Sequence, residues 1–177
     1  SIRSEAEDMQ QLIEKLLFLA RADQQRQVLH KENIELSELV GDVMRKMKLV
    51  TRTHSVELLE NEDGVIFADQ VTMRQMMRIF LENSTKYTPV GGHITARSRR
   101  TPDGKFMQME LADDGIGIAR EDQQKVFDRF YRADVSRSSK TGGSGVGLSV
   151  VRAIAEAHGG SATVSGHDHQ ITFTVRF

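Results

Sequence analysis

The sequence predicts a two-layer α/β sandwich in which three helices cover one face of a mostly antiparallel sheet, preceded by one separate coiled-coil-like helix. Apolar residues recur with the helical period in three segments after residue 36, which predicts the three helices. Other segments alternate apolar and polar residues, as in 107–111, where two methionines and a leucine point to one side. Two such segments, 93–100 and 105–113, flank Thr-Pro-Asp-Gly at 101–104, a strong hairpin signal.

A single helix is predicted for residues 1–25, before the sandwich begins. Its apolar residues fall at heptad spacing and widen into a broad stripe, which suits a helix bundle better than a two-stranded seam. The heptad positions are Met9, Leu12, Leu16 and Leu19, and the widening positions are Ile13, Leu17 and Ala20. The alternative is a helix that packs on its own domain.

A polar run at 23–27 ends this helical pattern and indicates a hinge. We therefore expect two units, a bundle helix over 1–27 and a compact domain over 28–177. Because the chain starts inside the helical pattern and without a methionine, we also expect it to be part of a longer protein.

The first half of the compact domain is expected to contain two helices and two strands. Ser37 is predicted to cap a helix that buries an apolar face. That face consists of Leu39, Val40, Val43, Met47 and Val50. Short strands at 55–60 and 65–68 are expected to be joined by a turn at 61–64. A second helix, 71–87, stops before Pro89.

The last third of the chain is expected to contain the third helix and two strands. This helix spans 147–158 and ends at Gly159 and Gly160, a typical helix stop. Final strands are expected at 161–166 and 170–177. The last strand alternates apolar residues on one face, namely Ile171, Phe173, Val175 and Phe177.

Composition excludes several classes of protein. The formal net charge of -1 gives no global electrostatic reason to expect nucleic-acid binding. The absence of cysteine excludes disulfides and thiolate metal sites. With 38% hydrophobic residues the chain can bury an ordinary core, but no apolar run approaches the length of a membrane span.

The first candidate motif is the turn Asp113-Asp114-Gly115-Ile116-Gly117, which follows the strand at 107–111. A carboxylate at the end of a strand can accept a hydrogen bond from an exocyclic amine, and glycines let backbone approach a flat ring. Alone, the motif is equally consistent with an ordinary acidic turn.

The second motif lies on the helix at 71–87, where Asn83, Lys86 and Tyr87 occur at i, i+3 and i+4 and so share a face. An amide oxygen for a hard cation, an ammonium for phosphate and an aromatic ring suit a metal–nucleotide site. The alternative is a helix with a polar exposed face.

Two further motifs follow along the chain. In 127–132, Phe127 and Phe130 can anchor a segment in the core while Arg129 and Arg132 face outward, and guanidinium suits a phosphoryl charge. The alternative is a short surface helix. Glycine-rich residues 142–149 open the third helix and offer free N–H groups to phosphate. This segment lacks the Lys-Ser/Thr of a Walker loop and does not directly follow a strand, as a Rossmann fingerprint would.

In this order the four motifs resemble the N, G1, F and G2 boxes of bacterial sensor histidine kinases. Residues 34–177 resemble their catalytic ATP-binding domain, which belongs to the GHKL class with the Bergerat fold. Helix 1–25 resembles the second helix of the dimerisation and phosphoacceptor bundle. The resemblance implies an ATP-dependent protein-histidine kinase that transfers the γ-phosphate of ATP to a histidine of the phosphoacceptor helix.

The resemblance also implies roles for individual residues. Asp113 is expected to bind the adenine amino group, Asn83 to ligate Mg²⁺, Lys86 to contact phosphates and Tyr87 to contact the base or ribose. Arg132 is expected to act at the γ-phosphate, with Arg129 and Lys140 as weaker candidates. The remaining nucleotide-binding positions are Gly115, Gly117, Gly143, Gly145, Gly147 and Leu148, with Thr172 as an outer adenine contact.

Implied ligands and partners are ATP or ADP with Mg²⁺, the protein's own phosphoacceptor domain within a homodimer, and the receiver domain of a response regulator. No nucleic acid is expected. The chain is then expected to be the cytoplasmic portion of a membrane-anchored sensor kinase.

Two departures from the family pattern leave alternatives open. Ile79 stands where the family often has a second magnesium-binding Asn, and where the related GHKL ATPases have a catalytic glutamate. None of the six histidines is followed by the Glu and nearby Thr/Ser-Pro of the phosphoacceptor motif. The alternatives are a catalytically silent nucleotide-binding interaction module and, less favoured because of Ile79, a GHKL ATPase.

Overall fold

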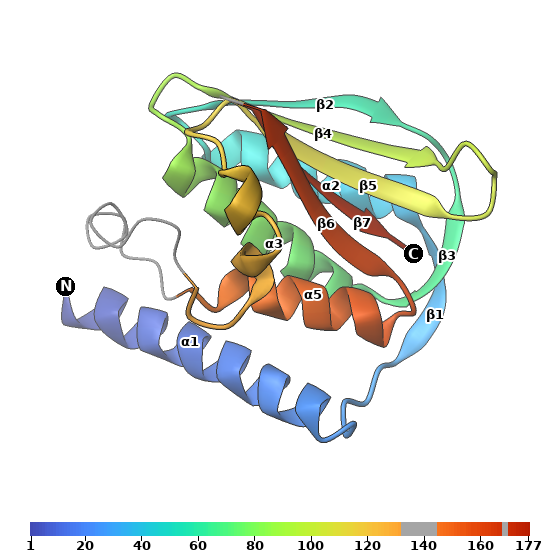
Figure 1. Cartoon of the computed structure of the whole chain (residues 1–177), viewed down its shortest axis with the longest axis horizontal. Coiled ribbons are helices and arrows are strands. Elements are labelled where there is room, and N and C mark those ends of the chain that lie inside the picture. Colours follow the sequence, from blue (N-terminus) through green and yellow to red (C-terminus); the bar gives the residue numbers. More distant parts are fainter. Residues whose placement is uncertain (132–144, 168–169) are drawn as a thin grey trace.

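A five-stranded sheet and three helices on one of its faces form most of the molecule (Figure 1). The computed structural model describes residues 1–131, 145–167 and 170–177. Strands β2 (Ser55–Asn61), β4 (His93–Arg100), β5 (Met107–Asp113), β7 (Gln170–Arg176) and β6 (Ser161–His167) follow one another across the sheet. Only β2 and β4 pair in parallel, and the other neighbours are antiparallel. The predicted two-layer, mostly antiparallel α/β sandwich is confirmed.

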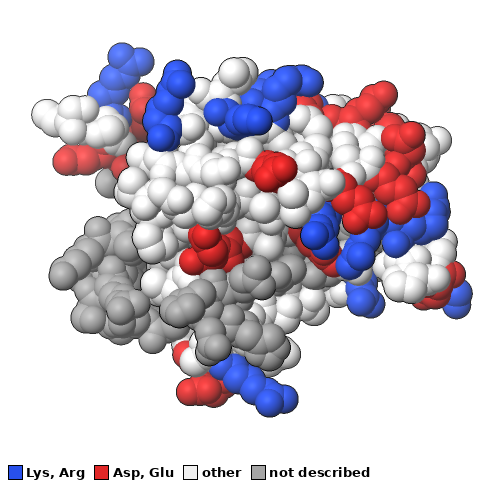
Figure 2. All heavy atoms as spheres, turned by 90° about the horizontal axis from the view of Figure 1, so that it is seen from above, with Lys and Arg blue, Asp and Glu red and all other residues white. Residues whose placement is uncertain are grey.

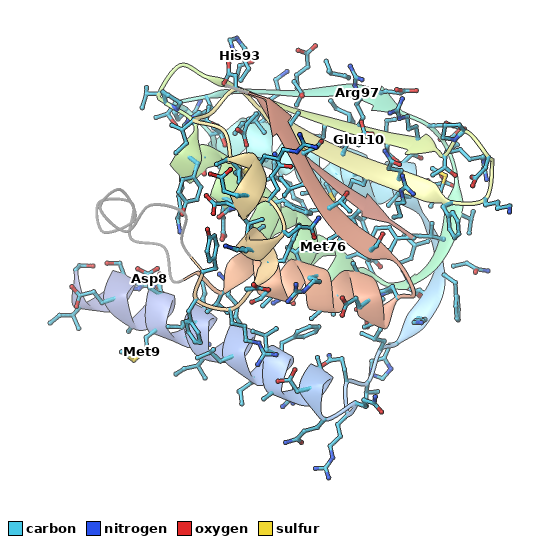
Figure 3. All side chains as sticks on the ribbon, in the orientation of Figure 1. Asp8, Met9, Met76, His93, Arg97 and Glu110 are labelled. Carbon is cyan, nitrogen blue, oxygen red and sulfur yellow. The ribbon has the colours of Figure 1, made fainter. Side chains whose placement is uncertain are left out.

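The central strand β5 carries the predicted alternation. Met107, Met109 and Leu111 are buried toward the helices, as expected. Glu110 lies on the opposite face of the sheet, where it pairs in register with Arg97 of β4 (Figure 3). The predicted hairpin is also confirmed, because β4 and β5 pair from Ile94–Asp113 to Arg100–Met107. This register fixes Asp113 at the end of the middle strand.

Helices α2 (Leu36–Val50), α3 (Gln70–Tyr87) and α5 (Gly147–Ala157) cover the sheet on one side. Their buried faces meet the apolar face of β5 in one core. Met76 of α3, fully buried, lies in this core between the sheet and the lower helices (Figure 3). The largest fully buried side chains of α3 and α5 are Met73, Met76, Met77, Phe80, Leu81 and Ile154.

The strands expected at 55–60 and 65–68 are present and are joined at residues 62–64, but they do not pair with each other as a hairpin. Strand β3 (Val65–Asp69) pairs with β1 (Lys31–Glu35), a strand that the sequence reading did not predict, in a separate two-stranded sheet. Ile34 and Ile66 are paired in register and both are buried, so this small sheet contributes its own side chains to the core. Strand β2 forms its hydrogen bonds with β4 and not with β3.

The predicted start of α2 is also wrong by two residues. The helix begins at Leu36, and Glu35 at the N-cap position makes no side-chain capping bond. Ser37 lies inside the first turn, where its hydroxyl donates to the carboxylates of Glu35 (3.1 Å) and Asp63 (2.9 Å). Val50, expected to point inward, is 73% exposed because it stands at the very end of the helix.

Helix α1 (Ile2–Asp23) packs against α5, on the side of that helix away from the sheet (Figure 1). Phe18 and Leu19 near its end are buried. The apolar residues that stay exposed include five of the seven predicted stripe positions, namely Met9, Ile13, Leu16, Leu17 and Ala20. Met9 points away from the rest of the chain (Figure 3). Of the helices in the described part of the chain, none is long and apolar enough to cross a membrane.

Candidate functional site

Asp113 is a buried carboxylate at the end of β5, with 4% of its surface exposed. Its Oδ1 accepts a hydrogen bond from the backbone N–H of Gly115 at 3.0 Å. Burial raises the pKa of Asp113 above its ordinary value, and the Gly115 N–H partly opposes this rise. A carboxylate that is removed from water but only partly satisfied by the protein is suited to accept a donor from a ligand.

Two hydroxyls from α3 lie beside Asp113, on Ser84 and on Thr88, which is the C-cap residue of the helix. Both side chains are buried, at 1% and 4% exposed. They help to lower the pKa of Asp113, yet neither hydroxyl has a hydrogen-bond partner of normal geometry within the described residues. The sequence reading assigned no role to either residue.

The signal for these two residues lay in the helical period of α3. Met73, Met77, Phe80, Ser84 and Thr88 follow one another at spacings of three or four, so a serine and a threonine occupy core positions at the end of an apolar stripe. Polar residues at such positions need a reason, because buried hydroxyls are normally hydrogen-bonded.

The turn after Asp113 is held close against the end of α3. The N–H of Ile116 points to the carbonyl of Tyr87 at 3.4 Å. A Cβ added at Gly115 would lie 2.5 Å from that carbonyl oxygen and 2.8 Å from Asp113 Oδ1, so no larger residue fits without movement. Gly117 adopts a φ of 78°, a conformation that favours glycine. The structure therefore gives a physical reason for both predicted glycines.

Asn83, Lys86 and Tyr87 lie on α3 next to this turn. Asn83 and Tyr87 are half-buried and Lys86 is exposed. In the described part of the chain, the Asn83 amide makes no hydrogen bond with the protein, so it is available to a ligand. The three predicted side chains are thus brought to the same end of α3 as Asp113.

Ile79 is a core residue, 4% exposed. It contacts the first turn of α5, because a Cβ added at Gly147 would lie 3.0 Å from Ile79 Cγ2. Its side chain offers neither a metal ligand nor a general base. Across the described residues, no cluster of three or more His, Cys, Asp or Glu side chains is arranged to hold a metal ion.

The segment around 127–131 meets one expectation and contradicts another. Phe127 is buried at the end of a short 3-10 helix, Lys125–Phe127, as predicted. Phe130 was expected to anchor the core but is 65% exposed. Its backbone has a φ of 63° and its N–H donates to the carbonyl of Gly145 at 2.8 Å, so the chain reverses there and turns the ring outward. Arg129 forms an ion pair with Asp23 of α1 at 2.6 Å.

The glycine-rich segment is described only from Gly145 onward. Gly145 has a φ of 73°, and a Cβ there would lie 2.9 Å from the backbone of Phe130. Gly147 begins α5, and Leu148 is half-buried against the core. Arg132, Lys140 and Gly143 lie outside the described residues. Thr172 pairs in register with Ala112, one residue from Asp113, but its side chain also lies outside the description.

His158 and Tyr131 are two further titratable side chains with a shifted pKa. His158 caps the end of α5, where its Nδ1 contacts the Ile154 carbonyl (2.7 Å) and its Nε2 accepts from the Asp69 N–H (3.0 Å). Burial lowers the pKa of His158, consistent with a neutral imidazole that donates through Nδ1. Tyr131 donates to Asp122, which raises the pKa of Tyr131 to about 12.

Charged residues are intermixed on the surface. Figure 2 shows basic and acidic side chains in neighbouring positions over the described part of one face, without separation into a basic and an acidic side. At one edge of the molecule, Nδ1 of His93 lies 2.8 Å from Oδ2 of Asp114 (Figure 3). Asp114 is the residue that follows Asp113 in the turn. This distribution agrees with the net charge of -1.

Comparison with known proteins gave matches over nearly the whole chain. Residues 68–177 match the family model described as "Histidine kinase-, DNA gyrase B-, and HSP90-like ATPase". The sensor histidine kinase WalK of Bacillus subtilis is 32% identical over 181 residues, which is 99% of this chain and 30% of WalK. The chain spans about a third of the length of the curated relatives it matches.

Solved structures share the fold. The histidine kinase AdeS of Acinetobacter baumannii matches with a TM-score of 0.80 and 23% identity over 100% of this chain and 81% of that chain. Full-length ShkA in complex with AMPPNP matches with a TM-score of 0.80 and 22% identity, over 98% of this chain and 36% of that chain. The similarity to AdeS runs through α1 as well as the sandwich, since it covers the whole chain.

Proposed function

The chain belongs to the family of histidine kinase-, DNA gyrase B- and HSP90-like ATPases and is an ATP-binding catalytic domain of the sensor histidine kinase type. On that premise we propose that it binds ATP through Asp113 and transfers the γ-phosphate to a histidine that lies outside residues 1–177. Relay of the phosphoryl group to the receiver domain of a response regulator follows from the same proposal. ShkA, a structural match, is recorded with AMPPNP bound.

The observation that carries the proposal is the environment of the Asp113 carboxylate. It is buried at a strand end, with a backbone N–H on Oδ1 and two hydroxyls beside it that have no other partner among the described residues. Adenine presents an exocyclic amine, and an ionised carboxylate is an acceptor only. Gly115 keeps the adjoining backbone bare, so that a flat ring can lie close to it.

The phosphate side of the proposed site is formed by the end of α3 and the start of α5. Lys86 is exposed at the end of α3, and Gly147 opens α5, whose first N–H groups are not used inside the helix. The carbonyl of Tyr87 lies beside the turn that follows Asp113, at the adenine end of the proposed site. On the sequence motif alone, we assign Arg132 to the γ-phosphate, with Lys140 as a weaker candidate, and Gly143 to the phosphate contacts. Arg129 is a weaker candidate because Asp23 already holds it.

Magnesium fits this site with a small contribution from the protein. Asn83 offers one amide oxygen, and Ile79 one turn earlier offers none. Because Mg²⁺ commonly keeps several waters and binds substrate phosphates, one amide is sufficient for the cation to arrive with the nucleotide. When bound, the cation would neutralise phosphate charge, while Asn83 would orient it.

The apolar side chain of Ile79 also argues against ATP hydrolysis as the main activity. An ATPase of this family needs a general base one turn before Asn83, and the Ile79 side chain is apolar and packed against α5. A nucleotide-sensing module without catalysis is the remaining alternative, and the assay below separates it from a kinase.

We assign residues 1–27 to the phosphoacceptor bundle and 28–177 to the catalytic domain. Met9, Ile13 and Leu17 of α1 are exposed apolar residues of the kind that a second copy covers in a homodimeric helix bundle. The parent protein is proposed to be a membrane-anchored sensor kinase with this chain on the cytoplasmic side.

The test is phosphotransfer in trans from radiolabelled ATP to the histidine-bearing bundle of the same parent protein. We expect magnesium-dependent label on the bundle that is lost in acid and stable in alkali, as phosphohistidine is. Asn83→Ala should abolish the transfer, whereas Asn33→Ala, on the exposed part of β1, should not. Transfer that survives Asn83→Ala would show that the metal is held elsewhere.

Two other results would also contradict the proposal. A chain that binds ATP but never labels the bundle would support the silent module. Label with the same chemical stability on this chain alone would show that one of its own six histidines is the acceptor.

A further inference from the structure

Two segments on neighbouring helices carry a local excess of positive charge. Residues 43–56, from the second half of α2 to the start of β2, and residues 70–81 of α3 together contain six of the 24 Lys and Arg and none of the 25 Asp and Glu. These six cations, called here the basic surface, are Arg45, Lys46, Lys48, Arg52, Arg74 and Arg78. Because the whole chain has a net charge of -1, the basic surface is a local exception.

An ion-pair network on Asp42 joins the two segments. Asp42 Oδ1 lies 2.6 Å from Arg45 Nη2, and Asp42 Oδ2 lies 3.1 Å from Lys46 Nζ, both on the same helix. Oδ2 also lies 2.6 Å from Nη1 of Arg74 on α3. The hydrogen bond from Arg74, followed by that from Lys46, lowers the pKa of Asp42 to about 2, so this carboxylate stays ionised. One negative charge is thus shared by three positive charges, and the balance around it stays positive.

The other three cations face solvent. Lys48, Arg52 and Arg78 are exposed, and among the described residues their charged groups form neither an ion pair nor a hydrogen bond. A cation in the last turn of a helix complements the negative end of the helix dipole, and Lys48 occupies that turn in α2. This effect does not explain why cations accumulate on two helices and in the segment between α2 and β2.

Two large aliphatic side chains lie among these cations. Leu49 and Val50 at the end of α2 are 67% and 73% exposed. Leu49 follows Arg45 by four residues and Lys46 by three, so the three side chains share the outer face of α2. Exposed aliphatic groups flanked by Lys and Arg are typical of surfaces that bind anionic phospholipid. The cations there meet the phosphates, and the apolar groups enter the headgroup boundary.

We propose that the basic surface, together with Leu49 and Val50, docks the domain onto an anionic phospholipid bilayer. Nucleic acid fits less well, because the two segments expose no Phe, Tyr or Trp on which a base could stack, and phosphates offer no cover to aliphatic groups. A protein partner would need acids opposite six separate cations, whereas a fluid headgroup layer needs no matching shape. In a membrane-anchored parent, as proposed above, the bilayer is always near, so weak binding is sufficient.

The experiment is co-sedimentation of the 177-residue chain with vesicles of phosphatidylcholine alone or with about one third phosphatidylglycerol. Each Lys or Arg near an anionic surface contributes about fivefold in affinity. The chain should therefore bind the anionic vesicles at least about 10-fold more tightly than the neutral ones at about 0.1 M salt, and lose this preference at about 0.5 M.

Two pairs of variants separate the surface from general charge and from general apolarity. Lys48→Gln with Arg52→Gln should weaken binding to anionic vesicles about 5- to 25-fold. Lys105→Gln with Arg26→Gln is the matched control, because it makes the same change in net charge at exposed positions outside the basic surface and should bind like the unsubstituted chain.

Leu49→Ala should weaken binding to the anionic vesicles about 3- to 10-fold, because it removes apolar area that enters the headgroup boundary. Its control is Leu59→Ala, which truncates an exposed leucine on β2 and should have no effect.

Three results would overturn the inference. The first is equal affinity for neutral and anionic vesicles. The second is a loss in the control pair as large as that in the Lys48 and Arg52 pair, which would show an effect of net charge alone. The third is tighter binding to polyglutamate or duplex DNA than to vesicles, unaffected by Leu49→Ala, which would indicate an acidic protein or a nucleic acid instead.

The inference is independent of the nucleotide site, and the experiment keeps the two apart. ADP calorimetry on the Lys48 and Arg52 double variant should give the affinity of the unsubstituted chain. A chain that binds ADP but not anionic vesicles overturns the inference and leaves the proposed function intact. A chain that binds anionic vesicles but no ADP does the reverse.

Discussion

Gly115→Ala is expected to destabilise the chain and to weaken nucleotide binding together. The added Cβ would lie 2.5 Å from the Tyr87 carbonyl oxygen, a separation that real Cβ atoms do not show, and this neighbour is backbone rather than a flexible side chain. The turn must therefore move away from α3. Movement stretches the contact from Ile116 N–H to Tyr87 and the bond from Gly115 N–H to Asp113.

Overpacking costs about 1–3 kcal/mol, and each weakened hydrogen bond costs about 0.5–1.5 kcal/mol. We expect a total near 3 kcal/mol, which for a chain of 177 residues lowers the melting temperature on the order of 10 °C. The assays are thermal unfolding and ADP calorimetry. Gly41→Ala is the matched control, because Gly41 lies inside α2 and an added Cβ would be in ordinary contact, 3.6 Å from Asn61 Nδ2.

The control substitution adds the same methyl group with the opposite expected sign. Alanine is favoured over glycine inside a helix by about 0.5–1 kcal/mol, so Gly41→Ala should stabilise the chain. A Gly115→Ala variant that melts with the parent and binds ADP with unchanged affinity would refute the close approach of this turn to α3, and with it the geometry of the site.

Two further predictions concern pH. Because burial raises the pKa of Asp113 above 3.8, the folded state is stabilised by its protonation, and that stability is lost as pH rises through the folded pKa. As the pH rises through the folded pKa, Asp113→Asn should therefore gain stability relative to the parent, as measured by urea unfolding from pH 3 upward. A difference in unfolding free energy between variant and parent that does not change with pH would contradict the burial effect. His158 has a pKa below 6.5, so its contribution is present above pH 6.5 and is lost as pH falls through the folded value. His158→Ala leaves the Asp69 N–H unpaired and should cost about 1–3 kcal/mol at pH 8, with the difference from the parent shrinking below pH 6.5; a cost that does not change with pH would contradict the neutral imidazole.

Local sequence patterns predicted those elements whose cause is local. The alternation from Met107 to Leu111, the turn at 101–104 and the period of α3 each follow from neighbouring residues, and the structure confirms all three. The partners of β2 and β3 did not follow, because β1 is distant from β3 in sequence and β2 pairs with β4 across α3. A turn signal at 61–64 shows only that the chain bends, and it does not say which strands then pair.

The candidate site shows the same division. The strand-end carboxylate and the glycines could be identified from sequence, because each carries its chemistry in its own side chain or in the lack of one. Phe130 could not be placed, because its exposure depends on a backbone bond to Gly145, fifteen positions later. Ser84 and Thr88 were overlooked, because a hydroxyl is informative only once its burial and the absence of a partner are known.

The central claim is that Asp113 binds the adenine of the nucleotide, and calorimetry of ADP binding to Asp113→Ala tests it most directly. Asp114→Ala is the control, because the Asp114 carboxylate already pairs with His93 at the surface. Loss of a charged hydrogen bond costs about 1.5–3 kcal/mol, so Asp113→Ala should bind ADP about 10- to 150-fold more weakly than the parent, with Asp114→Ala close to the parent. A folded Asp113→Ala variant with the ADP affinity of the parent would contradict the account.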